Sequence, residues 1–471
     1  MMTGMVSETR RTAVVGGQVV TGHDVVQADV LIEGERIAGI VAPGTLDGVE
    51  TRIDAAGCYV MPGVVDAHTH IKLDTGIYQT VDNWEVGTRA AAFGGVTTVI
   101  DFANQIKGEP FKAALEVRQA EAADAVIDYA FHMVVLEPAH DPDALRASLT
   151  RLMGLGVTSI KLFTTYRPNY YVDDATILRI FGALPDGMIA MIHCENDSIV
   201  TDATQRLVEA GQTDWRDHAQ SRPPEAEAEA VSRVLYLASL AKARVYIAHC
   251  STTMAVSEVN RVRGRDGRWE NAYCETCPQY VLLHDAVYDE AHPEHYILQP
   301  PLRSYHHTQS LLHYITAGQI DVLSTDSCDY SLAQKQATRD FTQTPGGLPG
   351  LETLLPLMFT TFHERLPLPR LVQLLSENPA RLFGLYPRKG ALLPSSDADL
   401  VIYDPEPRGT VRPEALHFLA GYTPYEGLAL HGQVRTVLSR GEVIVQGEEF
   451  TGQAGRGRFV TGGPSLAPVP V

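Results

Sequence analysis

The sequence predicts an α/β fold, a (β/α)8 barrel of the TIM type, with a small β-sandwich domain built from both ends of the chain. Short apolar runs alternate with helix-like segments such as residues 224–242, which is typical of a parallel sheet with crossover helices. Several of these runs lead into a histidine, lysine or aspartate. The chain has 471 residues, and a barrel needs roughly 250. A second domain is therefore expected.

The sandwich is predicted from two β-like segments. Residues 12–60 contain short apolar runs separated by turns, and residues 390–450 repeat this pattern, which indicates β strands. Helical sequence ends near residues 378–384, so the barrel should lie between the two segments. We divide the chain into the N-terminal part of the sandwich, the barrel, the C-terminal part of the sandwich and a tail rich in glycine and proline: residues 1–62, 63–387, 388–450 and 451–471.

Composition excludes several classes of function. The net charge of −19 argues against nucleic acids and anionic membranes as partners. We find no apolar stretch long enough to cross a bilayer, and residues 1–11 lack the apolar core of a signal peptide. We therefore expect a cytoplasmic protein. Its six cysteines are too sparse to predict a disulfide framework.

The chemistry of the chain is indicated by residues at the ends of the apolar runs. His68 and His70 follow the apolar stretch 59–65, and residues i and i+2 of a strand project from the same face. Such a histidine pair alone is weak evidence for a metal site, and a single histidine or aspartate is more often a satisfied core residue. However, later runs lead into Lys161, His193, His249 and Asp326. Functional groups at several strand ends are typical of a barrel enzyme.

Cys274 and Cys277 form a CxxC motif, which can be redox-active or supply half of a zinc site. No second CxxC occurs in the sequence, and Pro278 follows directly. We favour a structural role at a strand end.

From about residue 12 to residue 460 the chain resembles the dihydropyrimidinase and D-hydantoinase family of cyclic amidohydrolases. The stretches that carry the resemblance are Gly63-Val-Val-Asp-Ala-His-Thr-His70, Ser159-Ile-Lys-Leu-Phe163, His193-Cys-Glu-Asn196, Ser221-Arg-Pro-Pro-Glu225, Glu275-Thr-Cys-Pro-Gln-Tyr280, Gly346-Gly-Leu-Pro-Gly-Leu-Glu352, Ser376-Glu-Asn-Pro-Ala380 and Gly421-Tyr-Thr-Pro-Tyr-Glu-Gly427.

This resemblance implies two divalent metal ions, one bound by His68, His70 and Asp326 and the other by His193 and His249. It also implies that Lys161 is N6-carboxylated, because a protonated lysine cannot ligate metal whereas a carboxylated one can bridge two ions. A salt-bridged barrel lysine is the alternative. Zinc is expected, although manganese, cobalt or nickel would accept the same ligands.

The resemblance further implies that Asp326 moves a proton from the attacking water to the ring nitrogen, and that Tyr166 hydrogen-bonds the developing oxyanion. A buried structural tyrosine is the alternative for Tyr166.

The candidate substrate contacts depart from the family pattern. Gln299 stands where a serine is usual, Gly346 where an asparagine is typical, and Ser327 replaces the common histidine after the metal aspartate. Lys72 takes the place of an acidic residue and has the charge that dihydroorotases use to recognise a substrate carboxylate, although a solvent-facing loop lysine is the alternative. In the loop of residues 71–85, three side chains are candidates either to contact a ring substituent or to pack the loop: Ile77, Tyr78 and Trp84.

We therefore expect an enzyme that opens the cyclic amide bond of a dihydropyrimidine or 5-substituted hydantoin to an N-carbamoyl amino acid. An allantoinase-like enzyme and a hydrolase for an anionic cyclic amide are alternatives; Tyr166 argues against the first, and Lys72 and Gln299 favour the second. A non-catalytic scaffold is the third, but such relatives have lost metal ligands and this chain keeps all six. The partner is a small molecule, and the resemblance of the tail at 455–459 implies a homo-oligomer, either a tetramer or a dimer.

Overall fold

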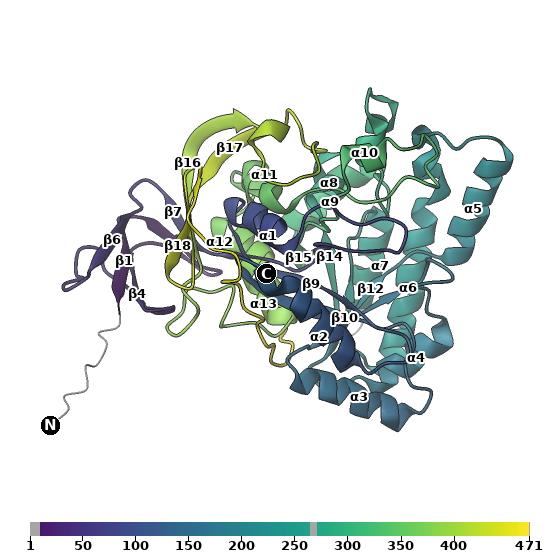
Figure 1. Cartoon of the computed structure of the whole chain (residues 1–471), viewed down its shortest axis with the longest axis horizontal. Coiled ribbons are helices and arrows are strands. Elements are labelled where there is room, and N and C mark those ends of the chain that lie inside the picture. The colour runs from purple at the N-terminus through teal and green to yellow at the C-terminus, as the bar shows by residue number, and fades with distance from the viewer. Residues whose placement is uncertain (1–9, 264–270, 471) are drawn as a thin grey trace.

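The computed structural model describes residues 10–263 and 271–470. A barrel of parallel strands surrounded by helices occupies the right of Figure 1, and a smaller β part lies at the left. The fold class predicted from the sequence is confirmed.

The barrel is one eight-stranded sheet in which each strand pairs with its sequence neighbour in parallel register. A bridge between Thr69 and Ser327 closes it, and the His70 amide donates to the Ser327 carbonyl at 2.8 Å. Every residue of β10 and β12 is buried, as expected for strands covered on both faces. The strands are β8 (Val64–Asp66), β9 (Val96–Asn104), β10 (Asp128–Val134), β11 (Ser159–Phe163), β12 (Ile189–His193), β13 (Val245–Ile247), β14 (Ala272–Thr276) and β15 (Val322–Leu323).

Helices cover the outside of this barrel (Figure 1). The helix predicted at 224–242 is α6, and α3 begins as its sequence indicates, with Asp141 capping the first turn and Pro142 in its first position. The helices are α1 (Trp84–Phe93), α2 (Phe111–Glu121), α3 (Pro142–Gly154), α4 (Asp174–Ala183), α5 (Asp197–Glu209), α6 (Pro224–Ala241), α7 (Thr253–Arg263), α8 (Pro278–Leu282), α9 (Tyr305–Thr316), α10 (Leu332–Lys335), α11 (Leu354–Phe362), α12 (Leu368–Val372) and α13 (Asn378–Leu382).

The β part contains a four-stranded sheet, ordered β5-β4-β1-β6, and a seven-stranded sheet, ordered β19-β18-β17-β16-β7-β2-β3. The seven-stranded sheet combines strands from both ends of the chain, as predicted. Buried residues of both sheets form one apolar cluster, in which Val14 and Val30 join Leu400 and Leu438. The strands are β1 (Arg11–Val15), β2 (Gln18–Val20), β3 (Val25–Gln27), β4 (Asp29–Glu33), β5 (Arg36–Val41), β6 (Thr51–Asp54), β7 (Tyr59–Pro62), β16 (Leu400–Thr410), β17 (Ala429–Ser439), β18 (Glu442–Gln446) and β19 (Glu449–Phe450).

Gly63 separates the two parts of the fold at their first junction. The apolar stretch 59–65 is divided there, so that β7 belongs to the seven-stranded sheet and β8 to the barrel. A Cβ atom at Gly63 would lie 2.0 Å from Oγ1 of Thr97, so only glycine permits this close approach. The domain boundaries at 62, 387 and 450 stay a prediction, because sheet membership does not fix them.

The tail of the chain packs along the barrel. The Gly457 amide donates to the Ala125 carbonyl at 2.8 Å, and the Val460 amide donates to the Tyr129 carbonyl at 2.7 Å. Val460 is fully buried. Because these acceptors lie just before or at the start of β10, the tail covers the amino-terminal ends of the strands. Its role as an oligomer contact stays a prediction.

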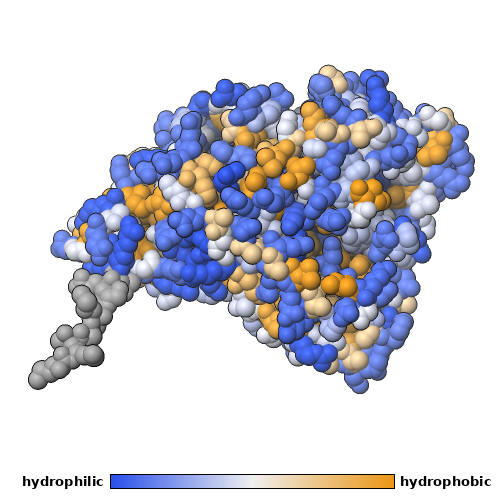
Figure 2. Space-filling model, in the orientation of Figure 1, coloured by the Kyte–Doolittle hydropathy of each residue, from blue (hydrophilic) through white to orange (hydrophobic). Residues whose placement is uncertain are grey.

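The face shown in Figure 2 is mainly hydrophilic, with hydrophobic residues in small groups. Within residues 10–263 and 271–470, no helix is long and apolar enough to cross a membrane. The six cysteines are buried and free, in agreement with the structural interpretation of Cys274 and Cys277.

Candidate metal centre

The six predicted metal ligands lie at the carboxyl ends of five barrel strands. His68 and His70 follow β8, Lys161 lies within β11, and His193 is the last residue of β12. His249 comes two residues after β13, and Asp326 three residues after β15. Since parallel strands end at the same edge of a barrel, their side chains converge there, which is the position of active sites in this fold.

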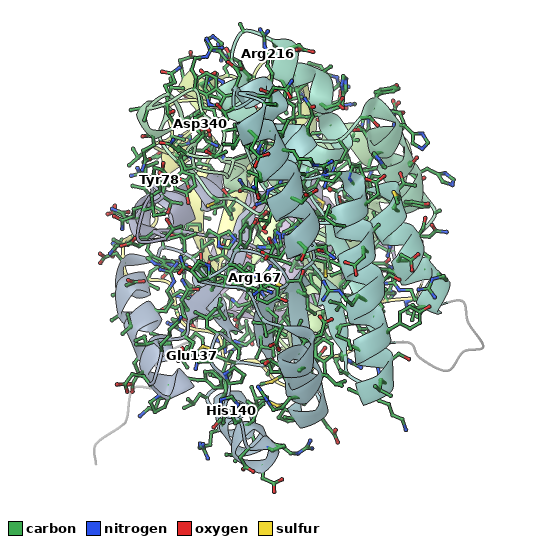
Figure 3. All side chains as sticks on the ribbon, turned by 90° about the vertical axis from the view of Figure 1, so that its right-hand side faces the viewer. Tyr78, Glu137, His140, Arg167, Arg216 and Asp340 are labelled. Carbon is green, nitrogen blue, oxygen red and sulfur yellow. The ribbon has the colours of Figure 1, made fainter. Side chains whose placement is uncertain are left out.

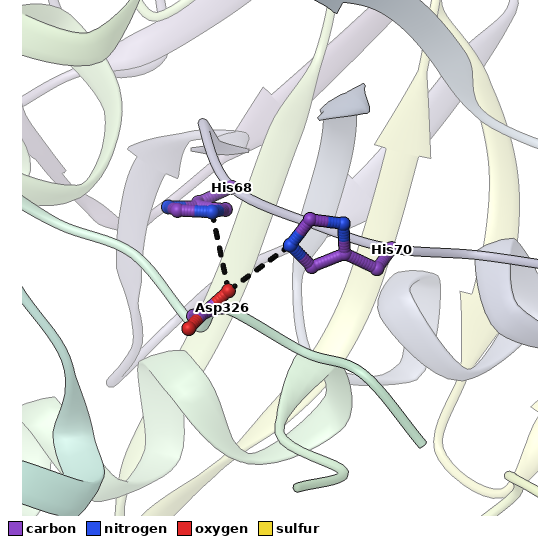
Figure 4. A group of neighbouring side chains, drawn as sticks. All are labelled: His68, His70 and Asp326. Atoms are coloured by element: carbon purple, nitrogen blue, oxygen red, sulfur yellow. Dashed lines mark ion pairs between the residues drawn. The ribbon is translucent and has the colours of Figure 1, made fainter. Parts of the chain in front are cut away.

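The first group of ligands consists of His68, His70 and Asp326 (Figure 4). The Nε2 atoms of the two histidines lie 3.1 Å and 3.2 Å from Oδ1 of Asp326. The three ligand atoms lie within 4.8 Å of one another. Burial opposes ionisation of Asp326, but His68 and His70 outweigh it and hold the pKa of this carboxyl below its usual value. The group therefore offers two imidazoles and one carboxylate to a single cation.

The second group lies beside the first. Nδ1 of His193 is 2.9 Å from Nε2 of His249. The rings of His68 and His249 have centroids 5.4 Å apart, and Nζ of Lys161 is 3.5 Å from Nε2 of His68. The structure thus brings all six predicted ligands into one cluster.

The protonation states of this cluster suit metal binding. Burial lowers the pKa of His68, His193 and His249, so their imidazoles stay neutral and keep a lone pair. Burial also lowers the pKa of Lys161 to about 8, although Glu275 and Asp326 oppose the shift. In the described chain, the Lys161 amine forms no ion pair with a carboxylate; its polar contact is the His68 imidazole. The alternative of a salt-bridged lysine is therefore not what the structure shows.

The donor set fits divalent metal ions. Imidazole nitrogens and carboxylate oxygens are the ligands that Zn²⁺ and its neighbours accept. The ring nitrogens of His193 and His249 face each other, so a cation bound between them would accept the lone pairs of both neutral imidazoles. Nδ1 of His249 is buried with no hydrogen-bond partner among the described residues. If Nε2 of His249 binds a cation, Nδ1 carries the proton of the neutral ring, so the atoms that the pair offers are the two facing nitrogens of His193 and His249.

Two buried carboxylates orient the histidines. Glu275, within β14, lies 2.5 Å from Nδ1 of His68 and accepts a hydrogen bond from the His249 amide at 3.0 Å. Glu195 lies 2.8 Å from Nε2 of His193 and pairs with Arg222. A carboxylate on one ring nitrogen leaves the other nitrogen free to ligate. Sequence reasoning missed these roles, although both glutamates lie at or near a strand end.

Tyr166 lies beside the cluster of predicted metal ligands. It is half-buried, three residues after β11, and its ring centroid is 4.9 Å from that of His193. The guanidinium carbon of Arg222 is 5.2 Å from the tyrosine ring centroid. Burial raises the pKa of Tyr166, so the hydroxyl stays protonated and can donate a hydrogen bond.

The backbone is strained at the predicted site. In the described chain, seven residues other than glycine have positive φ, and four of them are predicted site residues: Lys72 (50°), Tyr166 (74°), His249 (35°) and Asp326 (53°). Left-handed conformations of such residues cost energy and cluster at functional sites.

The structure brings two of the candidate substrate contacts, Gln299 and Gly346, into direct contact. Lys72 is half-buried at the start of the loop 71–82, where its amide donates to the Asp82 carbonyl at 3.1 Å. Ser327 holds the backbone, because its hydroxyl accepts a hydrogen bond from the Gly350 amide at 3.1 Å.

The loop residues differ in their surroundings. Ile77 is 79% exposed, and the Tyr78 hydroxyl donates to the Gln343 carbonyl. Tyr78 and Asp340 lie on the same side of the view in Figure 3. Trp84 is 1% exposed and contacts the rings of Tyr129 and Phe131, so it packs the core and does not line the site.

The fold and the cluster together define a class, a barrel enzyme that holds divalent metal ions at the carboxyl ends of its strands. Residues 59–444 match the model of the amidohydrolase family. The chain belongs to this family and is a hydrolase.

Three similar proteins carry the names of hydantoinases or a dihydropyrimidinase. The chain is 38% identical to the D-hydantoinase of Geobacillus stearothermophilus over 94% of its own length and 95% of that protein. It is 39% identical to a D-phenylhydantoinase of Escherichia coli, with 98% and 100% coverage. The crystal structure of the dihydropyrimidinase from Brevibacillus agri superimposes with a TM-score of 0.92 at 35% identity, covering 97% of this chain and 100% of the other. The resemblance seen in the sequence is confirmed.

Proposed function

We propose that this hydrolase opens the cyclic amide bond of a dihydropyrimidine or a 5-substituted hydantoin and releases an N-carbamoyl amino acid. The observation that carries the proposal is the convergence of four histidines, a lysine and an aspartate at one end of the barrel, with Tyr166 beside them. The names of the relatives point to the same substrate class.

His68, His70 and Asp326 would hold one divalent ion, and His193 and His249 the other. Lys161 would bridge the two ions as its N6-carboxylated form, since an ammonium group has no lone pair to offer. Zinc is the expected metal, and manganese, cobalt and nickel accept the same nitrogen and oxygen donors. Ions bound there supply a Lewis acid and a nucleophilic water at neutral pH.

The protein's own groups then move the proton and stabilise charge. The water oxygen joins the ring carbonyl carbon, and the bond from that carbon to the ring nitrogen breaks. Asp326 accepts the proton of the water and returns it to the departing nitrogen. Tyr166 donates a hydrogen bond to the oxygen on which negative charge develops.

Gln299, Gly346 and Lys72 are proposed substrate contacts. An amide side chain both donates and accepts hydrogen bonds, which matches the alternating N–H and C=O groups of an imide. Lys72 would pair with an anionic substituent, if the substrate has one. No comparison favours an allantoinase-like enzyme or a scaffold over a hydantoinase. We keep a cytoplasmic homo-oligomer, a tetramer or a dimer, as part of the proposal.

The test is ring opening by metal-reconstituted protein, produced in medium with bicarbonate, on dihydrouracil, 5-phenylhydantoin, allantoin and dihydroorotate in parallel. We expect turnover of one or both of the first two, abolished by Lys161→Ala. Turnover of allantoin or dihydroorotate alone would move the enzyme to another substrate class. Inactivity on all four with two metals bound would overturn the assignment.

A further inference from the structure

Lys335 is a buried lysine that the proposed reaction does not use. It is the last residue of α10 and is fully buried. Its Nζ donates to the carbonyl of Ile297 at 2.7 Å and to that of Pro345 at 2.8 Å. Among the described residues it forms no ion pair with a carboxylate. Burial lowers its pKa to about 7, and even a neutral amine keeps the two N–H donors that two carbonyls require.

The two carbonyls belong to the segments that carry Gln299 and Gly346. The Gln299 side chain fills the space that a side chain at position 346 would need. A Cβ atom at Gly346 would lie 1.8 Å from Oε1 and 2.5 Å from Nε2 of Gln299. Such distances are far inside van der Waals contact. The Gln299 amide therefore lies against the Gly346 backbone and fits because residue 346 is glycine. Gln299 and Gly346, which both depart from the family pattern, are thus in direct contact with each other.

This contact is joined to the metal centre through the backbone. The Gly347 amide donates to the Ile297 carbonyl at 3.0 Å, and the Cys328 amide donates to the Leu348 carbonyl at 3.0 Å. Cys328 is two residues from Asp326. A shift of the segment 345–350 would therefore move the Gln299 amide relative to the site.

We propose that Gln299 and Gly346 form a single specificity-determining unit for the substrate ring, and that Lys335 is the positioning residue that holds their two segments together. The inference rests on the proposed function. The Gln299 amide takes the space that a side chain at residue 346 would fill, so the two residues set the width and the hydrogen bonding of this side of the pocket together. Lys335 acts only through them.

The first test is a double-mutant cycle with Gly346→Ala and Gln299→Ser, assayed on dihydrouracil and 5-phenylhydantoin. In the natural chain, Gly346→Ala should raise KM by about tenfold, because coupling of this size is usual for residues in contact. In the Gln299→Ser background the same change should alter KM by less than about twofold, because the obstructing amide is gone. The metal content and kcat should stay within about threefold throughout, since the change acts on ring binding alone. Gln299→Ser should also change the ratio of kcat/KM for the two substrates.

The second test is Lys335→Met, which keeps an unbranched side chain, shorter by one atom, and removes its N–H donors. We expect a higher KM, an unchanged metal content and a smaller coupling between Gln299 and Gly346. Lys389→Met is the matched control: Lys389 is also fully buried, but it binds the carboxylates of Asp128 and Asp399, which lie outside the two segments that Lys335 joins. It should lower stability and leave KM unchanged.

The outcomes separate the two proposals. If the unaltered enzyme opens none of the ring substrates, the proposed function and this inference both fall. If it is active but the effects of Gly346→Ala and Gln299→Ser are additive, or the substrate ratio stays constant, the inference alone is overturned. If Lys335→Met does not fold, the double-mutant cycle still tests whether Gln299 and Gly346 act as one unit. If it folds and Lys389→Met reduces the KM coupling between Gln299 and Gly346 by the same amount, Lys335 has no special positioning role.

Discussion

Nδ1 of His68 lies 2.5 Å from the carboxylate of Glu275, and this contact leaves Nε2 of the same ring facing Asp326. The Glu275 carboxylate also accepts hydrogen bonds from the Tyr246 hydroxyl at 2.7 Å and the Ser324 hydroxyl at 2.5 Å. Residues on or beside β13, β14 and β15 thus orient a ligand that follows β8. The tautomer of His68 is fixed by this network.

Glu275→Gln should therefore weaken metal binding. A glutamine offers one acceptor oxygen where the carboxylate offers two, so some of these donors lose their partner and His68 loses its fixed orientation. Loss of such an orienting carboxylate costs about 10–100-fold in metal affinity. Competition with a chelator measures the loss. Glu352→Gln is the control, because Glu352 forms the same kind of contact with His417, at 2.7 Å, outside the predicted site. Equal affinity in the two variants would contradict the orienting role.

Lys161→Ala tests the bridging ligand. The alanine cannot take up carbon dioxide, so the intact mass of the natural protein should exceed the calculated mass by one carbon dioxide whereas that of the variant should not. The variant should bind fewer than two metal ions, and kcat/KM should fall by at least about 10³-fold, as for removal of a central member of a catalytic unit. Lys112→Ala removes an exposed lysine that pairs with Glu116 and should change neither. Full metal content in Lys161→Ala would disprove the bridge.

Tyr166→Phe removes one hydroxyl and keeps the ring. If this hydroxyl donates to the developing oxyanion, kcat should fall by about 10²–10³-fold, the usual cost of losing one such donor. Metal content and unfolding temperature should stay unchanged, because the aromatic contact with His193 is kept. Steady-state kinetics and metal analysis of one preparation give both answers. An unchanged kcat would mean that Tyr166 is a structural tyrosine, which is the alternative that the sequence analysis gave.

The predicted metal ligands could be picked out because they follow five separate apolar runs, with His68 and His70 after the same run. A buried strand gives a continuous apolar signal, and parallel strands bring their carboxyl ends to one edge, so His193 and Asp326 could be placed together from sequence order alone. The sequence analysis placed a domain boundary between residues 62 and 63, but the need for glycine at position 63 was not predictable, because it depends on the approach of Thr97 from another strand.

The supporting contacts could not be predicted, because they join residues far apart in the chain. His68 and Glu275 are 207 positions apart, and an acidic residue near a strand end gives no sign of which histidine it faces. Gln299 and Gly346 were each recognised as unusual for the family. That they compensate each other became visible only from the space that they share.

Lys335 also makes stability depend on pH. Burial lowers its pKa from 10.5 to about 7, so between these values the unfolded chain holds a proton that the folded chain lacks. Stability from this site is therefore lowest below pH 7 and rises with pH, by up to about 1.4 kcal/mol per unit. The groups that face Lys335 do not titrate in this range, because burial and neighbouring groups lower the pKa of His218 to about 3 and of His295 to about 4, hold that of Glu294 low and raise that of Cys328.

The comparison that isolates this effect is urea unfolding of the natural protein and Lys335→Met between pH 7 and pH 9.5. All other titrating groups are common to both proteins, so their contributions cancel in the difference. We expect the natural protein to gain stability relative to the variant as pH rises. A constant difference would mean that Lys335 keeps its ordinary pKa in the folded protein, and therefore that it binds the Ile297 and Pro345 carbonyls as an ammonium ion throughout this range.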